Sequence, residues 1–141
     1  MTIQFLILLA SMLGTRASGD LSLNFENLEK TGGTIRLALY DSPKNFMVEE
    51  KAVLYNFKAG KDGKLEASLP ALPYGTYAFA VFQDLNDNKA LGKNKFGIPT
   101  EPYAFSKIPP SKWRLPTFDE VKFDIRYPQQ SLTVRLEKWK L

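Results

Sequence analysis

The sequence contains no cysteine and no histidine among its 141 residues. Without cysteine there can be no disulfide, no thiolate nucleophile and no cysteine-ligated zinc, so core packing has to hold the fold together. Without histidine, serine–histidine–aspartate and cysteine–histidine catalysis, histidine metal ligation and the usual proton shuttle near neutral pH are excluded. Any activity must therefore use carboxylates, amides, hydroxyls, lysines and aromatic rings.

The familiar enzyme motifs are also missing. The sequence has no G-x-S-x-G elbow, no phosphate-binding glycine loop and no metalloprotease helix. Carboxylate catalysis would need two acids held within about 5 to 10 Å across a cleft. The acids available in the one long loop are Asp84, Asp87 and Glu101. We therefore expect no enzyme, and keep a carboxylate-based hydrolase as an alternative.

No apolar run is long enough to span a bilayer, which needs about 20 residues. The amino-terminal segment instead has the layout of a secretory signal peptide, because an apolar run over residues 5–13 precedes a polar stretch with small residues. We predict a signal peptide over residues 1–19, with Ala17 as the alternative cleavage site. The domain over residues 20–141 is then expected to be periplasmic or secreted.

Neither sign of charge dominates the chain. It carries 19 Lys and Arg against 15 Asp and Glu, a net charge of +4. Loss of Arg16 with the signal peptide lowers this to about +3, far below the charge density of a nucleic-acid-binding domain. We expect no nucleic-acid partner, and predict a monomer whose partner is a ligand or protein of the cell envelope.

A hydrophobic content of 44% is enough for one domain with a real core. Apolar and polar residues alternate with the period of half-buried strands, whereas helical periodicity is scarce. One segment, 76–82, is apolar at nearly every position and predicts a central strand covered on both faces. The other predicted strands are 21–25, 35–39, 53–57, 65–69, 121–125 and 132–136, the last two forming a closing hairpin through residues 127–130.

These segments predict an all-β fold, a single seven-stranded antiparallel β-sandwich with one long irregular loop. The Leu-Pro-Tyr-Gly-Thr-Tyr stretch over residues 72–77 is similar to the strand start of transthyretin-like sandwiches. Pro73 fixes φ and Gly75 allows positive φ, so we expect a sharp turn there. A short helical turn with a capping box is expected from Thr117 to Val121.

The long loop, residues 84–117, contains five prolines and opens with an acidic and amide-rich turn. Asp84, Asn86 and Asn88 place oxygen ligands at alternate positions, as the first half of a calcium loop does. The second half is missing, because Lys89 and Lys95 stand where glycine and glutamate are expected. Two interpretations stay open, a calcium site and a turn whose side chains satisfy backbone groups of the loop.

The rest of the loop is aromatic and basic. We predict a ligand surface, in which exposed rings stack on sugars or apolar groups and lysines meet anions. The residues assigned to it are Phe96, Tyr103, Phe105, Trp113 and Lys95. The alternative is that the rings anchor the loop as a small satellite core, folded back over the sandwich. The loop's basic residues are a solvated face or a site for a polyanion such as lipid headgroups, and Trp139 is interpreted as the end of an edge strand.

The motifs Lys-Phe-Gly-Ile-Pro at 95–99 and Tyr-Ala-Phe-Ser at 103–106 carry a family resemblance. The chain resembles the bacterial domain-of-unknown-function family 2141, which implies a small exported immunoglobulin-like β-sandwich. In that family residues 83–92 typically read H-D-x-N-x-N-G-x-L-D, and this chain departs at Gln83, Lys89 and Gly92. We therefore expect a non-enzymatic binding or scaffolding protein of the cell envelope that uses the 84–117 loop. A calcium-dependent binding module with its metal at Asp84–Asn88 is the alternative.

Overall fold

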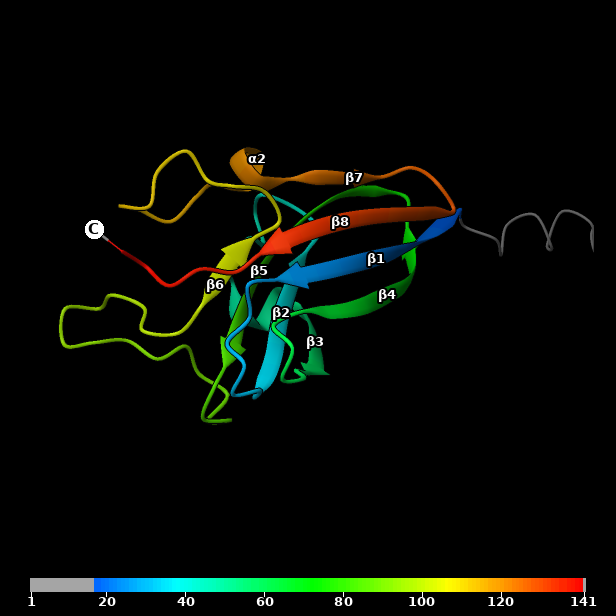
Figure 1. The fold of residues 1–141 in the computed structure, drawn as a ribbon. Helices are drawn as coiled ribbons and strands as arrows, with labels where there is room; N and C mark the ends of the chain where they lie inside the picture. Colours follow the sequence, from blue (N-terminus) through cyan, green and yellow to red (C-terminus); the bar gives the residue numbers. More distant parts are fainter. Residues whose placement is uncertain (1–16, 141) are drawn as a thin grey trace, which may run out of the picture.

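The computed structural model describes residues 17–140, which form two β-sheets and two short helical turns (Figure 1). One sheet has the strand order β4 (Leu65–Pro73), β1 (Ser18–Glu26), β8 (Gln129–Arg135). The other has the order β3 (Val53–Lys58), β2 (Thr34–Tyr40), β5 (Gly75–Asp84), β6 (Tyr103–Phe105), and β7 (Phe123–Ile125) also pairs with β5. The helical turns are η1 (Glu49–Lys51) and α2 (Phe118–Val121). The prediction of a nearly all-β chain is confirmed.

One hydrophobic core lies between the two sheets, whose strands cross at a steep angle in Figure 1. Alternate residues of β1 and β2 are buried, as the period of the sequence predicts, and the two rows meet in the same cluster. Strand β5 is covered on both faces. Phe79 belongs to the main core, whereas Ala78 belongs to a second cluster with Phe118 and Val121 of α2. The prediction of a central strand is therefore confirmed.

The predicted strand count and pairing need two corrections. The described residues contain eight strands rather than seven, because Tyr103–Phe105 forms β6 inside the segment predicted to be irregular. The sheets are not wholly antiparallel either, since β1 and β8 pair in parallel, with Leu21 beside Gln130 and Phe25 beside Val134. Apolar alternation shows which residues face the core, but it carries no information on strand direction or partner.

The predicted closing hairpin is wrong for a related reason. β7 pairs with β5 and β8 pairs with β1, so the connection at residues 126–128 crosses from one sheet to the other. The ten residues of β5 are long enough to pair with β6 over residues 80–82 and with β7 over residues 75–77. Ser106, which follows β6, links β5 to α2, because its Oγ accepts from the Phe79 amide and donates to the Val121 carbonyl.

Both predicted local motifs form. Thr117 and Glu120 make the capping box of α2. The turn between β4 and β5 is tight, and the Tyr77 hydroxyl donates to the Pro73 carbonyl at 2.6 Å. The positive φ lies at Ala71, with φ 54°, rather than at Gly75.

The predicted signal peptide lies outside the described residues except for residues 17–19. Of these, Ser18 and Gly19 already belong to β1, and a side chain at Gly19 would collide with the Tyr127 carbonyl. Cleavage after Gly19 would thus remove the first two residues of this strand, whereas cleavage after Ala17 would retain them. Across residues 17–140, no helix has the length and apolar character needed to cross a membrane.

Candidate functional site

The long connection begins at Asp84, the last residue of β5, whose side chain is 0% exposed. Its Oδ2 accepts a hydrogen bond from Arg36 Nε at 2.6 Å and another from the Lys89 amide at 2.8 Å. Its Oδ1 accepts from the Asn88 amide at 3.2 Å. Arg36 comes from the neighbouring strand β2, so the carboxylate ties the turn to the sheet.

The protonation of Asp84 follows from these contacts. Burial alone would raise the pKa of the carboxyl group, because it disfavours the charged form. The hydrogen bonds from Arg36, Lys89 and Asn88, together with the Arg36 charge, outweigh burial and hold the pKa of Asp84 below its ordinary value. Asp84 is therefore an ionised, internally paired carboxylate at neutral pH.

The other two predicted metal ligands also have partners within the turn. Asn86 Oδ1 accepts from the Asn88 amide at 3.4 Å, and Asn88 Oδ1 accepts from the Ala90 amide at 3.1 Å. Within residues 17–140, no three acidic side chains lie together in a group that could hold a metal ion. This geometry favours the turn in which side chains satisfy loop amides, with the Arg36 guanidinium as the cation beside Asp84. Calcium binding by Asp84, Asn86 and Asn88 stays a prediction.

Lys89 stands where the H-D-x-N-x-N-G-x-L-D motif has glycine, and its φ is 67°. This is the left-handed region that glycine adopts without steric cost. The turn therefore keeps the backbone conformation for which a glycine would be suited, although the side chain differs. Gly33, from the turn between β1 and β2, lies so close to the Asp84 carbonyl that a side chain there would clash at 2.3 Å.

Gln83, the other departure from the motif, is fully buried and fastens that same turn. Its Nε2 donates to the carbonyls of Glu29 and Gly32 at 2.9 and 2.6 Å, and its Oε1 accepts from the Glu29 amide at 2.8 Å. Both the amide nitrogen and the amide oxygen of the side chain are therefore hydrogen-bonded to backbone groups of this turn. Gln83 is accordingly a structural residue at the base of the long connection.

Glu101, midway along the 84–117 connection, holds the acidic-amide turn from its other side. Its two carboxylate oxygens accept hydrogen bonds from the Leu85 and Gly92 amides, both at 2.7 Å, and the residue is buried. Thus two of the three acids considered for carboxylate catalysis are turned inward and bonded. The third, Asp87, accepts from Thr34 Oγ1 at 2.5 Å.

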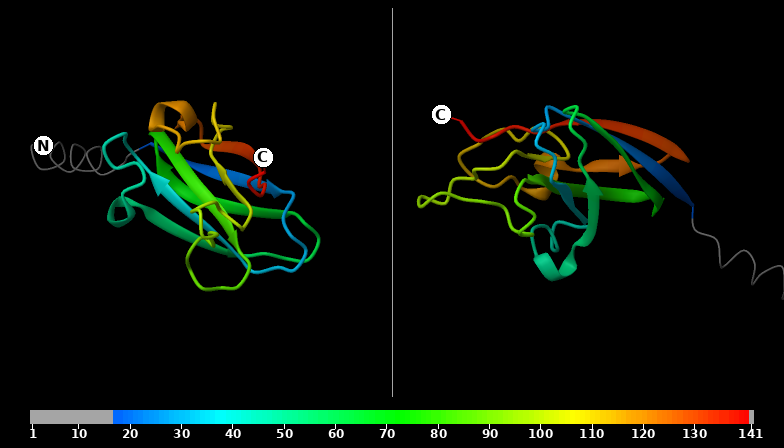
Figure 2. Two further views of the ribbon diagram at one scale, coloured as in Figure 1. Left: turned by 90° about the vertical axis from the view of Figure 1, so that its left-hand side faces the viewer. Right: turned by 60° about the horizontal axis from the view of Figure 1, so that its bottom comes forward.

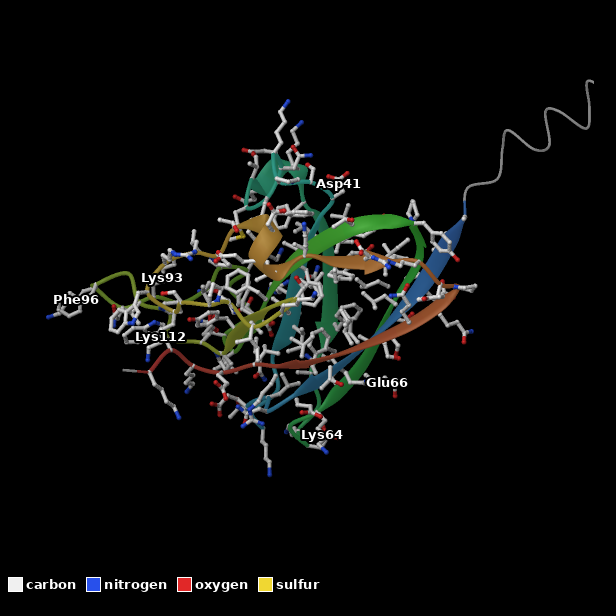
Figure 3. All side chains as sticks on the ribbon, turned by 90° about the horizontal axis from the view of Figure 1, so that it is seen from above. Asp41, Lys64, Glu66, Lys93, Phe96 and Lys112 are labelled. Atoms are coloured by element: carbon white, nitrogen blue, oxygen red, sulfur yellow. The ribbon has the colours of Figure 1, made fainter. Side chains whose placement is uncertain are left out.

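Beyond this base, residues 92–100 form a hairpin-like projection (Figure 1), and Phe96 lies near its tip (Figure 3). Asn94 builds the turn, because its Oδ1 accepts from the Phe96 and Ile98 amides at 2.9 and 3.1 Å. The Phe96 ring is 75% exposed, and Lys95 Nζ lies 5.3 Å from its centroid. The projection thus has an ordered backbone and an unburied ring.

The residues predicted to form one ligand surface fall into two groups, one partly buried and one exposed. Tyr103 and Phe105 lie on β6, are partly buried and contact each other edge to face at 6.3 Å. Phe105 packs against the cluster of Ala78, Phe118 and Val121, which is the satellite-core arrangement. Burial raises the pKa of Tyr103 above its ordinary value. The alternative, in which the loop's large apolar residues fold back over the sandwich, does not hold for Phe96, Ile108 and Trp113, which are exposed.

Trp113 finds its partner at the far end of the sequence. Its ring meets the Trp139 ring edge to face at 5.3 Å, and Lys112 Nζ lies 5.6 Å from Trp113 and 5.1 Å from Trp139. Trp139 Nε1 also donates to the Lys112 carbonyl at 3.1 Å. The interpretation of Trp139 as an edge-strand end is wrong, because β8 ends at Arg135 and the tryptophan docks on the 107–117 loop. No sequence signal joins residues so far apart.

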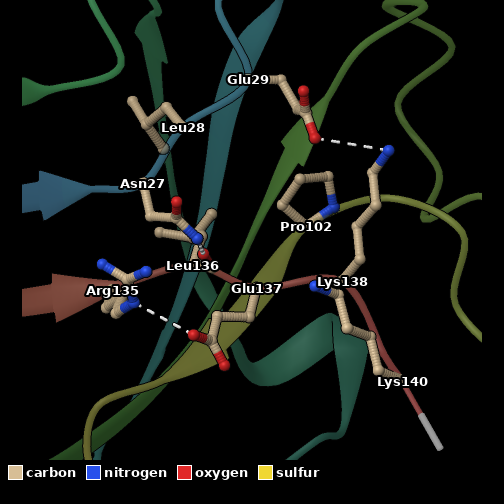
Figure 4. A pocket seen from close by; sticks show the side chains of 9 residues that line it. All are labelled: Asn27, Leu28, Glu29, Pro102, Arg135, Leu136, Glu137, Lys138 and Lys140. Atoms are coloured by element: carbon tan, nitrogen blue, oxygen red, sulfur yellow. Dashed lines mark hydrogen bonds and ion pairs between the residues drawn. The ribbon is translucent and has the colours of Figure 1, made fainter.

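A hollow of about 480 Å³ is lined in part by Lys138 and Lys140, the sequence neighbours of Trp139 (Figure 4). Ion pairs flank it, Glu29 with Lys138 at 3.3 Å and Arg135 with Glu137 at 3.0 Å. Its lining is Asn27, Leu28, Glu29, Pro102, Arg135, Leu136, Glu137, Lys138 and Lys140. The hollow is open and mostly polar, so it offers no enclosed cleft for a small apolar substrate.

The chain belongs to DUF2141, a family described as uncharacterized proteins conserved in bacteria, whose model matches residues 23–133. The match runs from within β1 to within β8 and includes the whole 84–117 connection. The predicted family is therefore confirmed. Neither the curated proteins nor the solved structures contain a significant match to the chain.

Proposed function

We propose that this protein is an exported, non-enzymatic binding or scaffolding domain of the cell envelope, and that it binds through residues 84–117. The observation that supports binding is the contrast between an ordered loop backbone and its exposed side chains. Phe96 is 75% exposed and Trp113 is 71% exposed, although hydrogen bonds fix the turns that carry them. Rigid exposed aromatic side chains bind at a low entropic cost.

The proposal excludes carboxylate catalysis because of how the loop acids are used. Asp84 is paired with Arg36 and two amides, and Glu101 accepts from two amides. A general acid needs a raised pKa, whereas that of Asp84 is lowered. We further propose that the two sheets form an immunoglobulin-like or transthyretin-like β-sandwich, with a signal peptide before it.

Binding is tested by co-sedimentation of the purified protein with isolated bacterial membranes and, separately, with peptidoglycan, and by crosslinking to soluble envelope proteins. A variant carrying Phe96→Ser and Trp113→Ala is compared with one carrying Tyr127→Ala, an exposed ring outside the loop. We expect one fraction to retain the wild type and the Tyr127→Ala control but to lose the double variant. Equal behaviour of all three proteins in every fraction would refute the proposal.

Export is tested by expressing the full chain in a bacterial host and measuring the intact mass of the protein in each compartment. We expect a periplasmic or secreted protein that lacks residues 1–19. A mass that retains residues 18 and 19 would place cleavage after Ala17 instead. A full-length chain confined to the cytoplasm would contradict export.

A further inference from the structure

Three segments distant in sequence project from one end of the molecule. They are the projection at 92–100, the loop at 107–116 and the carboxyl-terminal residues 137–140, all of which extend to the left in Figure 1 and toward the viewer in the left panel of Figure 2. Backbone bonds between Tyr103 and Glu137, both at 3.1 Å, fix the third segment beside the first two. We call this region the basic-aromatic end.

The apolar part of the basic-aromatic end consists of side chains that the fold leaves in solvent. Ile108 is 94% exposed and Leu115 is 65% exposed, in addition to Phe96 and Trp113. They sit on protruding turns rather than on a sheet face, so they could enter a soft surface without a matching groove. A single exposed apolar side chain is common on protein surfaces, but several at one end of a molecule indicate an interaction site.

The charged part consists of lysines interleaved with those residues. Figure 3 shows Lys93, Phe96 and Lys112 at the same extremity. Lys93, Lys95, Lys107 and Lys112 form no ion pair with a carboxylate in residues 17–140. Glu101 is the one acidic residue between positions 88 and 118, and its carboxylate is buried against the Leu85 and Gly92 amides. In the third segment Glu137 pairs with Arg135, and Lys138 pairs with Glu29. The charge of these four lysines therefore has no carboxylate partner among the described residues.

We propose that the basic-aromatic end docks on the surface of an anionic phospholipid bilayer. The proposal rests on the proposed function, since it names the partner of the same loop. Lysines attract anionic headgroups, while tryptophan and aliphatic side chains settle at the boundary between headgroups and acyl chains. The charge complementarity selects lipid over neutral glycan, and the protruding apolar tips suit a deformable surface.

The two tryptophans of the chain, Trp113 and Trp139, both lie at this end and form a pair. Intrinsic fluorescence therefore reports on the proposed interface without a label. The experiment titrates the purified protein with vesicles of phosphatidylcholine alone, and with vesicles that also contain phosphatidylglycerol. Co-sedimentation of the same vesicles gives an independent measure of binding.

We expect a blue shift and co-sedimentation with the phosphatidylglycerol vesicles, weak or no binding to phosphatidylcholine, and release by added salt. Substituting Lys93, Lys95, Lys107 and Lys112 by Gln should weaken binding by up to about 600-fold, since each of the four lysines contributes roughly fivefold near an anionic surface. A matched control substitutes Lys44, Lys51, Lys61 and Lys64, which are exposed on other parts of the surface, and should bind as the wild type does.

The apolar contribution is tested by Phe96→Ser with Ile108→Ser, which keeps both tryptophans as reporters. Both side chains are exposed, so the variant should fold. We expect binding about tenfold weaker, with its dependence on salt retained.

Equal binding to both vesicle types, or none to either, would overturn the proposal, as would an identical fluorescence shift with inorganic phosphate alone. If membranes fail but peptidoglycan or an envelope protein binds through Phe96 and Trp113, the lipid proposal is wrong while the proposed function stands. If no envelope fraction binds, both are wrong.

Discussion

The turn at Asp84 and the tips at Phe96 and Trp113 belong to one connection, yet they use their side chains in opposite ways. At Asp84 every carboxylate bond goes to Arg36 or to an amide of the same turn. At the tips the backbone is bonded but the rings remain in solvent. The polar groups of the acidic-amide turn are therefore already hydrogen-bonded within the fold, although this turn carries the clearer ligand motif, whereas the exposed rings remain available for contact.

The largest expected effect is the loss of stability in Asp84→Ala. Removing one partner of a buried ion pair leaves Arg36 and two amides without their acceptor, and should cost about 3 kcal/mol. Urea unfolding at neutral pH measures it, with Asp87→Ala, a more exposed acid of the same turn, as the control. We expect the loss to be the same with calcium and with a chelator. A calcium-dependent rise in wild-type stability that disappears in Asp84→Ala would restore the metal interpretation.

Acid should erase the contribution of the Asp84 pair. The pKa of Asp84 is lowered in the folded state, so its stabilisation is fully present above the unfolded pKa of about 4 and is lost as pH falls through the lower folded pKa. The difference in unfolding free energy between the wild type and Asp84→Asn should therefore shrink below about pH 4. A difference that stays constant between neutral pH and strong acid would show that the carboxylate charge is not what stabilises the turn.

Glu101→Gln should have a smaller effect, of about 1.5 kcal/mol. The amide keeps one acceptor but turns its NH₂ group toward the second backbone amide, so one of two charge-assisted hydrogen bonds is lost. Hydrogen exchange at Leu85 or Gly92 should accelerate locally. Glu137→Gln, an exposed acid, serves as the control. Unchanged exchange at both amides would mean that Glu101 does not hold the acidic-amide turn.

The smallest effect on stability is expected at the tips. Phe96→Ser with Ile108→Ser should change the free energy of unfolding by about 0.5 kcal/mol or less, because exposed side chains lose little on substitution. Phe79→Ala, by comparison, empties a core position and should cost about 3 kcal/mol or more. A large loss in the double variant would show that the tips are structural, and would remove the contrast with Asp84.

Local features of the fold were readable from the chain. The alternation of Leu21, Leu23 and Phe25 gave the buried face of β1, and the Thr117 and Glu120 pair gave the capping box of α2. Both depend on residues close in sequence, where side-chain period and capping chemistry act directly. Strand β6 was missed because three residues between prolines are too short for a period to show.

Only the local parts of the candidate site could be predicted from the sequence, for the same physical reason. The acidic-amide turn and the aromatic segment could be located, but Arg36 lies 48 positions from Asp84 and Trp139 lies 26 from Trp113. A motif of oxygen ligands does not reveal whether an arginine of another strand already occupies their centre. Nor does a tryptophan near the end of a chain reveal the ring on which it docks.

The sequence by itself determined the excluded chemistries, the all-β class, the family and the place of the long connection, because composition and short-range period are properties of the chain alone. The tertiary structure decided which side chains of that connection are hydrogen-bonded within the fold and which remain exposed to solvent. It also decided that β1 and β8 run in parallel and that β7 and β8 part to different sheets. Strand direction, strand partners and side-chain burial depend on which distant strands pack around the same core. They are therefore set only when the two sheets pack together.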